Sequence, residues 1–286
     1  MNTKTKTKTL AEAANATFKA RWIGTASSRS REAQVRCIVK YFGSKTPITK
    51  ITTKSVLDYV KYLEEKIGND VETRNKKISA ISVILDHAYT EGWIESLPRL
   101  KGRKSANNQC KEYISKEEEN IILPFMQNHD LESMRYFGDF WAWSVDTGLR
   151  PSESRRIKTQ DIYKEPGIGF VVRINQTKTN DWRVIPLTQR AYEIFMLQNQ
   201  EQPWAAMNES RIKHAWNRVR EFRNRQGDRN YKPYLTRHTT GSRLLQNRVD
   251  ITLVRDVLGH SNIQTTLRYA KNSPQHLAEA MKTLNV

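Results

Sequence analysis

The sequence predicts a mainly α-helical protein with one small antiparallel β-sheet, divided into two domains. Three observations predict this fold: the length, the helical spacing of apolar residues over most of the chain, and two adjacent β-forming segments in its second half. Because domains commonly run to about 100–200 residues, a chain of 286 residues is expected to form two. No apolar run reaches the length of about 18 residues that a membrane span needs, so a membrane protein is not expected.

Residues 1–9 alternate Thr and Lys and are expected to form a disordered basic tail. They contain no apolar segment of the kind that a secretory signal requires. The two cysteines, Cys37 and Cys110, have neither CxxC spacing nor nearby histidines, so neither a disulfide framework nor a structural zinc site is expected. These features are typical of a protein of the reducing cytoplasm.

A helical domain is expected over residues 10–99. Helices at about 10–22 and 29–42 are followed by one that begins at an N-cap, Thr53, and stops at Gly68. A fourth helix ends near Gly92. The apolar stripe of the third helix is Val56, Leu57, Val60, Leu63 and Ile67, and that of the fourth is Ile78, Ile81, Ile84, Leu85 and Ala88.

Residues 100–112 are polar and basic, show no periodicity, and are expected to be a linker. The second domain, residues 113–272, restarts with the capping-box pattern that runs from Ser115 to Glu118. An aromatic helix then ends at Gly148; its apolar stripe is Met134, Phe137, Phe140, Trp141 and Val145.

The only β signal is the pair of segments 169–174 and 182–187, which predicts a hairpin. Helices are expected to resume at Thr188. The last segment, residues 273–286, begins with Ser-Pro, which is typical of a helix start, and is expected to be a short C-terminal helix.

The charge points to a polyanionic partner. The net charge is +18, and residues 1–111 hold 22 Lys and Arg against 10 Asp and Glu, whereas residues 112–286 hold 26 against 20. Because no single amphipathic helix gathers these cations beside Trp and Leu, nucleic acid is favoured over an anionic membrane.

Five residues in the second domain are candidates for chemistry. Arg150 follows a helix-ending glycine, Lys178 lies in the hairpin turn, Arg237 opens a helix, and His260 stands nine residues before Tyr269. A tyrosine is a poor nucleophile at neutral pH because its ordinary pKa is about 10, so a catalytic tyrosine needs neighbours that stabilise charge. Each residue alone is a weak signal, and a lone arginine is usually a surface charge.

Together, these segments resemble the tyrosine recombinases, the phage-type integrases. Thr-Gly-Leu-Arg-Pro-Ser-Glu around Arg150 is similar to their first arginine motif, Lys178 to their hairpin lysine, and Arg237 to their second arginine. The segment from Leu258-Gly259-His260 to Tyr269 is similar to their histidine and nucleophile box. The resemblance covers most of residues 113–270, and the preceding helices match the SAM-like core-binding domain of that family.

The resemblance implies a site-specific recombinase that cleaves DNA through a 3′-phosphotyrosyl link to Tyr269, with neither metal nor ATP and no cofactor. Arg150 and Arg237 are suited to bind the phosphate oxygens bidentately, and Lys178 to protonate the leaving 5′ oxygen. His260 would hydrogen-bond the phosphate or the attacking group. Glu153, one turn past Arg150, is expected to orient a cation rather than to react.

One position departs from the family pattern. A histidine typically stands three residues before the second arginine, and here that place holds Tyr234. Its phenol could donate a hydrogen bond to phosphate but is a weaker base than imidazole. His238 is an alternative partner in a different helical register, although a packed or surface histidine is the commoner role.

Two other functions remain open at this point. A type IB topoisomerase would use similar chemistry without pairing two sites. A repressor or accessory factor on the same scaffold would bind DNA without reacting, and would have no need for all five candidate residues together.

The expected partners follow from the resemblance. They are double-stranded DNA, three further copies of the chain in a homotetramer on paired sites, and possible accessory DNA-bending or directionality factors, with no membrane. Residues 273–286 would pass between neighbouring protomers. The expected location is the bacterial cytoplasm, in association with the nucleoid.

Overall fold

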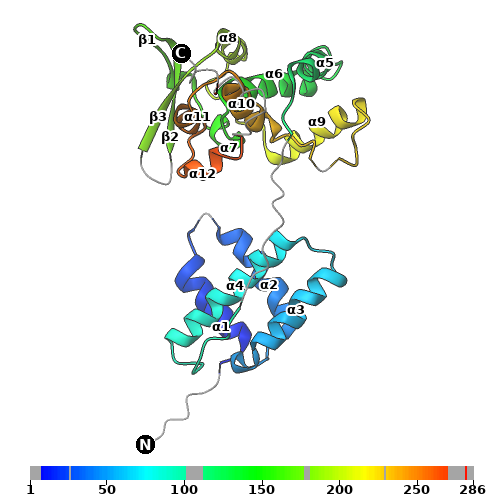
Figure 1. Cartoon of the computed structure of the whole chain (residues 1–286), viewed down its shortest axis with the longest axis vertical. Helices are drawn as coiled ribbons and strands as arrows, with labels where there is room; N and C mark the ends of the chain where they lie inside the picture. The colour runs from blue at the N-terminus through cyan, green and yellow to red at the C-terminus, as the bar shows by residue number, and fades with distance from the viewer. Residues whose placement is uncertain are drawn as a thin grey trace, which may run out of the picture. The chain divides into compact units, whose positions relative to one another are not determined.

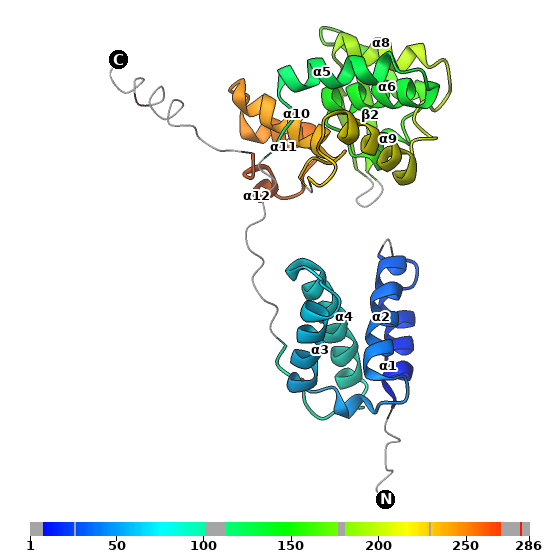
Figure 2. The ribbon, with the colours of Figure 1, turned by 90° about the vertical axis from the view of Figure 1, so that its right-hand side faces the viewer.

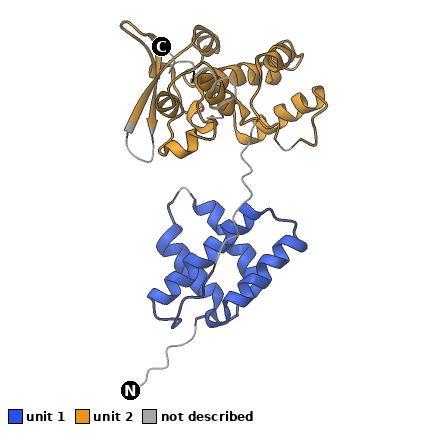
Figure 3. Ribbon diagram, viewed as in Figure 1, with its two compact units in different colours: residues 1–108 blue, residues 109–286 orange. Residues whose placement is uncertain are grey.

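The computed structural model describes residues 8–25, 27–100, 112–176, 181–228, 230–269 and 281. The chain forms two compact units, residues 1–108 and 109–286, each with its own hydrophobic core (Figure 3). Within the described ranges, no helix is both long enough and apolar enough to cross a membrane.

The described residues of the first unit form a bundle of four α-helices with one short π-helix and one 3₁₀ turn (Figures 1 and 2). Its α-helices are α1 (Leu10–Thr17), α2 (Ser28–Phe42), α3 (Thr53–Glu65) and α4 (Val71–Thr90). A π-helix, η1 (Phe18–Trp22), continues α1, and a 3₁₀ turn, η2 (Ile48–Lys50), precedes α3. The helices expected at 10–22 and 29–42 are therefore confirmed.

The bundle begins earlier than expected. Thr9 is the N-cap of α1: its side chain accepts a hydrogen bond from the Glu12 amide, and the Glu12 carboxylate accepts from the Thr9 amide. The carbonyl of Lys8 accepts from the amide of Ile48 at 2.9 Å. Lys8 and Thr9 thus belong to the folded unit, and assigning them to a disordered tail was wrong.

The start and the buried face of α3 also differ from expectation. The N-cap is Thr52, because its backbone is extended and its hydroxyl accepts from the Ser55 amide at 3.2 Å. The buried residues follow the i, i+3, i+4, i+7 pattern of one helix face; they are Val56, Tyr59, Val60 and Leu63. Leu57 and Ile67 are 59% and 51% exposed, so including them in the stripe was wrong.

The apolar stripe expected in α4 is confirmed, since all five of its residues are buried. The helix ends at Thr90, and Gly92 then takes a left-handed conformation with φ of 70°. A regular period over 20 residues is a strong signal, which explains why α4 was predicted more accurately than α3.

The second unit contains eight α-helices, one 3₁₀ turn and three strands among its described residues. In chain order they are α5 (Lys116–Gln127), α6 (Glu132–Thr147), α7 (Pro151–Ser154), η3 (Thr159–Asp161), β1 (Ile162–Glu165), β2 (Gly169–Gln176), β3 (Asp181–Pro186), α8 (Gln189–Leu197), α9 (Glu209–Phe222), α10 (Leu235–Gln246), α11 (Ile251–Leu258) and α12 (Ile263–Thr266).

The sheet has three antiparallel strands in the order β1-β2-β3. The predicted hairpin is confirmed as β2 and β3, whose register pairs Val172 with Ile185. The strand β1 was missed. It spans only four residues, of which two are charged, and Gly167 and Gly169 form its turn to β2 with φ of 75° and 109°.

The expected capping box at the start of α5 forms only in part. Ser115 accepts a hydrogen bond from the Glu118 amide at 3.1 Å, as predicted. The Glu118 carboxylate instead accepts hydrogen bonds from the guanidinium of Arg223. It also accepts one from the hydroxyl of Tyr231, at 2.7 Å. A strong cation in reach competes better for a carboxylate than a single backbone amide does.

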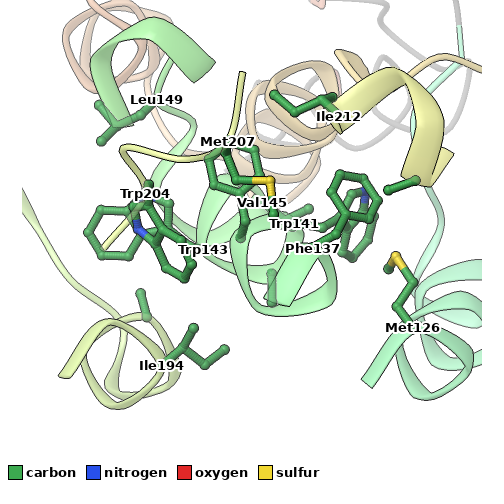
Figure 4. Close-up of a cluster of buried hydrophobic side chains, with 14 of the residues drawn as sticks. Met126, Phe137, Trp141, Trp143, Val145, Leu149, Ile194, Trp204, Met207 and Ile212 are labelled. Carbon is green, nitrogen blue, oxygen red and sulfur yellow. The ribbon is translucent and has the colours of Figure 1, made fainter. Parts of the chain in front are cut away.

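Aromatic side chains on α6 form the centre of the second core. Phe137, Trp141 and Trp143 are buried and lie among residues from the surrounding elements, including Trp204 and Ile212 (Figure 4). Helices α5, α8, α9 and α10 all contact α6. This packing fixes the C-terminal end of α6, where the candidate site begins.

Candidate active site

The end of α6 holds Arg150 on a constrained backbone. Gly148 takes the left-handed conformation, with φ of 64°, and a Cβ there would lie 2.9 Å from Leu258 Cδ2, so glycine is required for space as well. Pro151 is the first residue of α7. Arg150 therefore is the last of the three residues that connect α6 to α7, as its sequence context predicts.

Glu153 binds Arg150 through both backbone and side chain. Its Oε2 accepts from the Arg150 amide at 2.8 Å, and its Oε1 accepts from Arg150 Nη1 at 2.9 Å. Arg150 Nη2 also donates to the carbonyl of Gly259 at 3.4 Å. The Arg150 side chain is 38% exposed, so the guanidinium is oriented by these bonds but remains accessible.

Arg237, in the first turn of α10, is 1% exposed. Its Nη1 donates to the carbonyl of Gly148 at 2.7 Å, and its Nη2 donates to the carbonyl of Leu258. Burial, followed by the charge of Arg150, lowers the pKa of Arg237 to about 10, so it stays cationic at neutral pH. This guanidinium joins the C-terminal ends of α6 and α11.

The sequence-based reasoning missed Arg183, on β3. Its Nη2 and Nη1 donate to the two carboxylate oxygens of Glu153 at 3.1 and 3.4 Å, and both side chains are almost fully buried. Burial alone would raise the pKa of Glu153, but the hydrogen bond and charge of Arg183, with those of Arg150, lower it. The available signal was strand alternation, which places Arg183 on the same side as buried Ile185.

Arg183 also packs behind Gly259, the left-handed C-cap of α11. A Cβ at Gly259 would lie 2.6 Å from Arg183 Cζ, so no side chain fits there without displacing the guanidinium. Gly259 in turn precedes His260. The cation on β3 thus supports the loop that carries the histidine.

His260 is held in its neutral form. Its Nδ1 lies 2.9 Å from the hydroxyl of Thr266, which is fully buried. Burial, then the charges of Arg237 and Arg150, lower the pKa of His260 to about 4. At neutral pH the imidazole is therefore uncharged and has both a donor and an acceptor nitrogen.

Tyr269 lies just after α12, and its amide donates to the Thr266 carbonyl at 2.9 Å. Its ring runs nearly parallel to that of His260, with centroids 6.3 Å apart. The ring of His238 meets it edge-on, with centroids 5.4 Å apart. The short helix thus places the tyrosine beside the histidine nine residues earlier.

Of the predicted residues, the structure brings Arg150, Arg237, His260, Tyr269 and Glu153 to one place. Tyr234 precedes α10 and is 40% exposed; its ring contacts His238. Lys178 lies outside the described residues, as do the linker residues 101–111 and, apart from Met281, the expected C-terminal helix 273–286.

Two guanidinium groups, a neutral imidazole and a phenol form a site that is suited to a phosphodiester. The cations could bind non-bridging oxygens while the phenol attacks phosphorus. Among the side chains that the structure describes, no group of three His, Cys, Asp or Glu is arranged to hold a metal ion.

Comparison with known proteins identifies related sequences over both units. The sequence model described as the phage integrase family matches residues 112–276, and that of the phage integrase SAM-like domain matches residues 10–104. Tyrosine recombinase XerA of Pyrococcus furiosus is 24% identical over 250 residues, which are 82% of each chain. The integrase of Escherichia phage 186 is 23% identical over 78% of this chain and 67% of its own length.

Solved structures share the fold at low sequence identity. The Tn1549 transposon integrase in complex with a circular intermediate DNA superposes with a TM-score of 0.76 at 18% identity, covering 96% of this chain and 99% of that one. A lambda integrase tetramer bound to a Holliday junction gives a TM-score of 0.69 at 17% identity, over 94% and 80% of the two chains.

Proposed function

The chain belongs to the phage integrase family, whose sequence model spans more than half of it, and we propose that it is a site-specific DNA recombinase with Tyr269 as its nucleophile. The observation that carries this proposal is the cluster of Arg150, Arg237, His260 and Tyr269. Arg150 donates to the carbonyl of Gly259, next to His260, and Arg237 donates to the carbonyls of Gly148 and Leu258, which lie close in the chain to Arg150 and His260.

The first step is attack of the Tyr269 oxygen on a DNA phosphorus atom. The new P–O bond to tyrosine forms as the P–O5′ bond breaks, and the products are a 3′-phosphotyrosyl link and a free 5′ hydroxyl. Charge accumulates on the non-bridging oxygens, where Arg150 and Arg237 bind. Lys178 gives its proton to the departing 5′ oxygen, and the hydroxyl proton of Tyr269 is released to water as its oxygen bonds to phosphorus, so the protons of the step balance.

Three further groups support this step. Glu153 orients Arg150 through its paired hydrogen bonds, while Arg183 holds Glu153 from the other side. His260, being neutral, can donate a hydrogen bond to a phosphate oxygen or accept one from the attacking hydroxyl. Because the phosphotyrosyl link conserves the bond energy, a 5′ hydroxyl from another strand reverses the step without ATP.

DNA and further copies of the chain are the proposed partners. The +18 charge supports binding to the DNA backbone, which makes the affinity strongly dependent on salt. The shared fold with a lambda integrase tetramer on a Holliday junction supports assembly of four copies on two sites. Residues 273–286 would link neighbouring protomers, and an accessory DNA-bending or directionality factor would set the direction of exchange.

A nicked suicide substrate tests the chemistry. The wild-type chain should form a covalent adduct with DNA that survives denaturation, because the 5′ product diffuses away and religation fails. Tyr269→Phe should abolish the adduct, whereas Tyr89→Phe, at an exposed tyrosine of α4, should leave it unchanged. Specific DNA binding without any adduct would instead support a DNA-binding protein that lacks the activity.

Deletion of residues 273–286 tests the assembly. The truncated chain should still bind one site and form the adduct but should fail to pair two sites, as measured by gel shift with one and two sites. Unchanged recombination by the truncated chain would reject the role of this segment.

A further inference from the structure

We propose that Tyr234, the N-cap of α10, together with His238 and Gly241 on the helix, forms a seat that fixes the ring of Tyr269 for attack, with His238 as a positioning residue. This inference rests on the proposed function, because it explains how the nucleophile is held. The three positions are spaced by four and three residues, so they lie on the same side of the helix.

Gly241 forms the floor of this seat. A Cβ at this position would lie 3.0 Å from both Cδ2 and Cε2 of Tyr269 and 3.1 Å from Leu258 Cδ1. Gly241 is not among the glycines with positive φ, so its backbone does not require glycine. Since glycine inside a helix is less favourable than alanine, the space for the ring is its evident purpose here.

His238 forms one wall of this seat, and the ring of His260 is a second neighbour of Tyr269. The His238 ring meets the Tyr269 ring at 62°, with centroids 5.4 Å apart, while the His260 ring lies nearly parallel at 6.3 Å. Tyr234 stands one turn before His238, and the centroids of the two rings are 5.6 Å apart. Tyr234 forms the outer, more exposed end of the seat. The tyrosine ring is thus bounded by two imidazoles and a helix backbone.

The charge state of His238 suits this role. Burial, followed by the charges of Lys232, Arg237 and Arg268, lowers its pKa to about 4, and its Nδ1 is buried without a hydrogen-bond partner. Among the described residues, the titratable rings of Tyr234 and Tyr269 also face it. A neutral ring packs edge-on against an aromatic neighbour without adding a further cation beside the two arginines.

Gly241→Ala in the full-length chain tests the floor of the seat, in single-turnover cleavage of the nicked substrate. The added methyl must displace the ring by a few tenths of an ångström, and we expect cleavage to slow on the order of tenfold with unchanged DNA affinity, because misplacement by about 1 Å can cost a hundredfold and this shift is smaller. Gly227→Ala is the matched control, since a Cβ there meets nothing within 4 Å.

Equal cleavage rates for the two alanine variants would overturn the proposal. This result differs from failure of the proposed function, in which the wild-type chain itself would form no adduct. Thermal unfolding of both variants distinguishes a displaced ring from a destabilised helix, because the inference requires slow cleavage by a chain that is fully folded at the assay temperature.

Two substitutions at His238 separate ring packing from nitrogen chemistry. His238→Phe keeps a flat ring of similar size, so cleavage should stay within about tenfold of wild type. His238→Ala removes the wall and should reduce cleavage on the order of a hundredfold. If both variants lose activity equally, a ring nitrogen of His238, and not the packing of its ring, supports cleavage, and the proposed positioning role is wrong.

A substrate with sulfur at the leaving 5′ position gives a readout that general destabilisation would not. Sulfur leaves without protonation, so Lys178→Ala should regain cleavage on this substrate. Gly241→Ala and His238→Ala should remain slow, because their defect lies in the approach of the nucleophile. Recovery of these two variants would contradict the seat.

Discussion

The two units of the molecule use buried charge differently. Among the described residues of the first unit, the buried polar or charged side chains are Thr17, Arg74 and His87, and the helices are held by apolar packing. The second unit buries Glu119, Glu153 and Arg237, each bonded to more than one partner. Apolar packing is sufficient to make a bundle, whereas a site that must bind a phosphate needs cations held in place within the protein.

The contrast extends to what each buried charge connects. Arg74 pairs with Glu64 at 2.6 Å, and that partner is 42% exposed, so the pair lies at the edge of the bundle. Glu119 instead binds Arg190 of α8 and Arg243 of α10, and thereby joins α5 to both. Because α10 also carries Arg237, this network supports the helix on which the candidate site depends.

The largest expected effect comes from matched substitutions of the two buried arginines. Arg237→Lys removes the planar fork that bonds two carbonyls and that, in the proposed function, binds the phosphate, so cleavage should fall about a hundred- to a thousandfold. Arg74→Lys in the first unit should leave the cleavage rate of the folded protein unchanged. Single-turnover cleavage measures both, and equal losses would break the distinction between the units.

Glu153→Gln should have the next largest effect. It leaves Arg150 and Arg183 without their shared counter-charge, so cleavage should slow on the order of tenfold or more, and the second unit should lose about 3 kcal/mol of stability. The folded pKa of Glu153 is lowered below 4.5, so its ionised form stabilises the fold above that value and the contribution is lost at lower pH.

Urea unfolding between pH 3 and 7 checks the Glu153 prediction. The wild-type second unit should lose stability as the pH falls below about 4.5, through the lowered pKa of Glu153, and Glu153→Gln should lose less over that interval. An identical acid dependence in both proteins would show that this carboxylate is not ionised and bound as the structure has it.

The histidines of the site should produce a smaller, pH-dependent effect. His238 and His260 have folded pKa values of about 4, below the ordinary 6.5, so the unfolded chain takes up protons first as the pH falls. Stability contributed by their neutral forms is complete above about pH 6.5 and declines toward pH 4. NMR titration of labelled histidine side chains should find both still neutral at pH 5.5, and a midpoint near 6.5 would contradict their burial among arginines.

The smallest effect concerns the start of α3 in the first unit. Thr52→Ala should cost about 1 kcal/mol, because it removes the side chain that caps the Ser55 amide. Thr53→Ala, one residue later, lies inside the helix and should be nearly neutral or stabilising. Thermal unfolding of the two variants decides between the observed cap and the cap expected from the sequence.

Regular periodicity made most of the fold predictable. The stripe of α4, the aromatic face of α6 and the hairpin of β2 and β3 all repeat the same spacing over several residues. Short or irregular features were not predictable in this way. The four-residue strand β1 has too few positions to establish a period, and the cap of α3 lies in a run of two threonines that differ only in backbone conformation.

The candidate site was predictable where a local motif fixes the backbone. Arg150 follows Gly148 and precedes Pro151, and each of these residues constrains the chain. Arg183 has no such local context, because its importance comes from Glu153, thirty residues away in the sequence. Contacts of this kind depend on the packing of α7 against β3, which no short segment of the sequence encodes.

The two carbonyl contacts of Arg237 have a consequence for the entropy of substrate binding. An arginine side chain has many rotamers in solution, and ordering it costs free energy. Here that cost is met during folding, because the guanidinium is already bonded to Gly148 and Leu258 before any phosphate arrives. Of its five N–H donors, those that do not bond these carbonyls are held in a fixed orientation, so the proposed binding of a phosphate would cost little further conformational freedom.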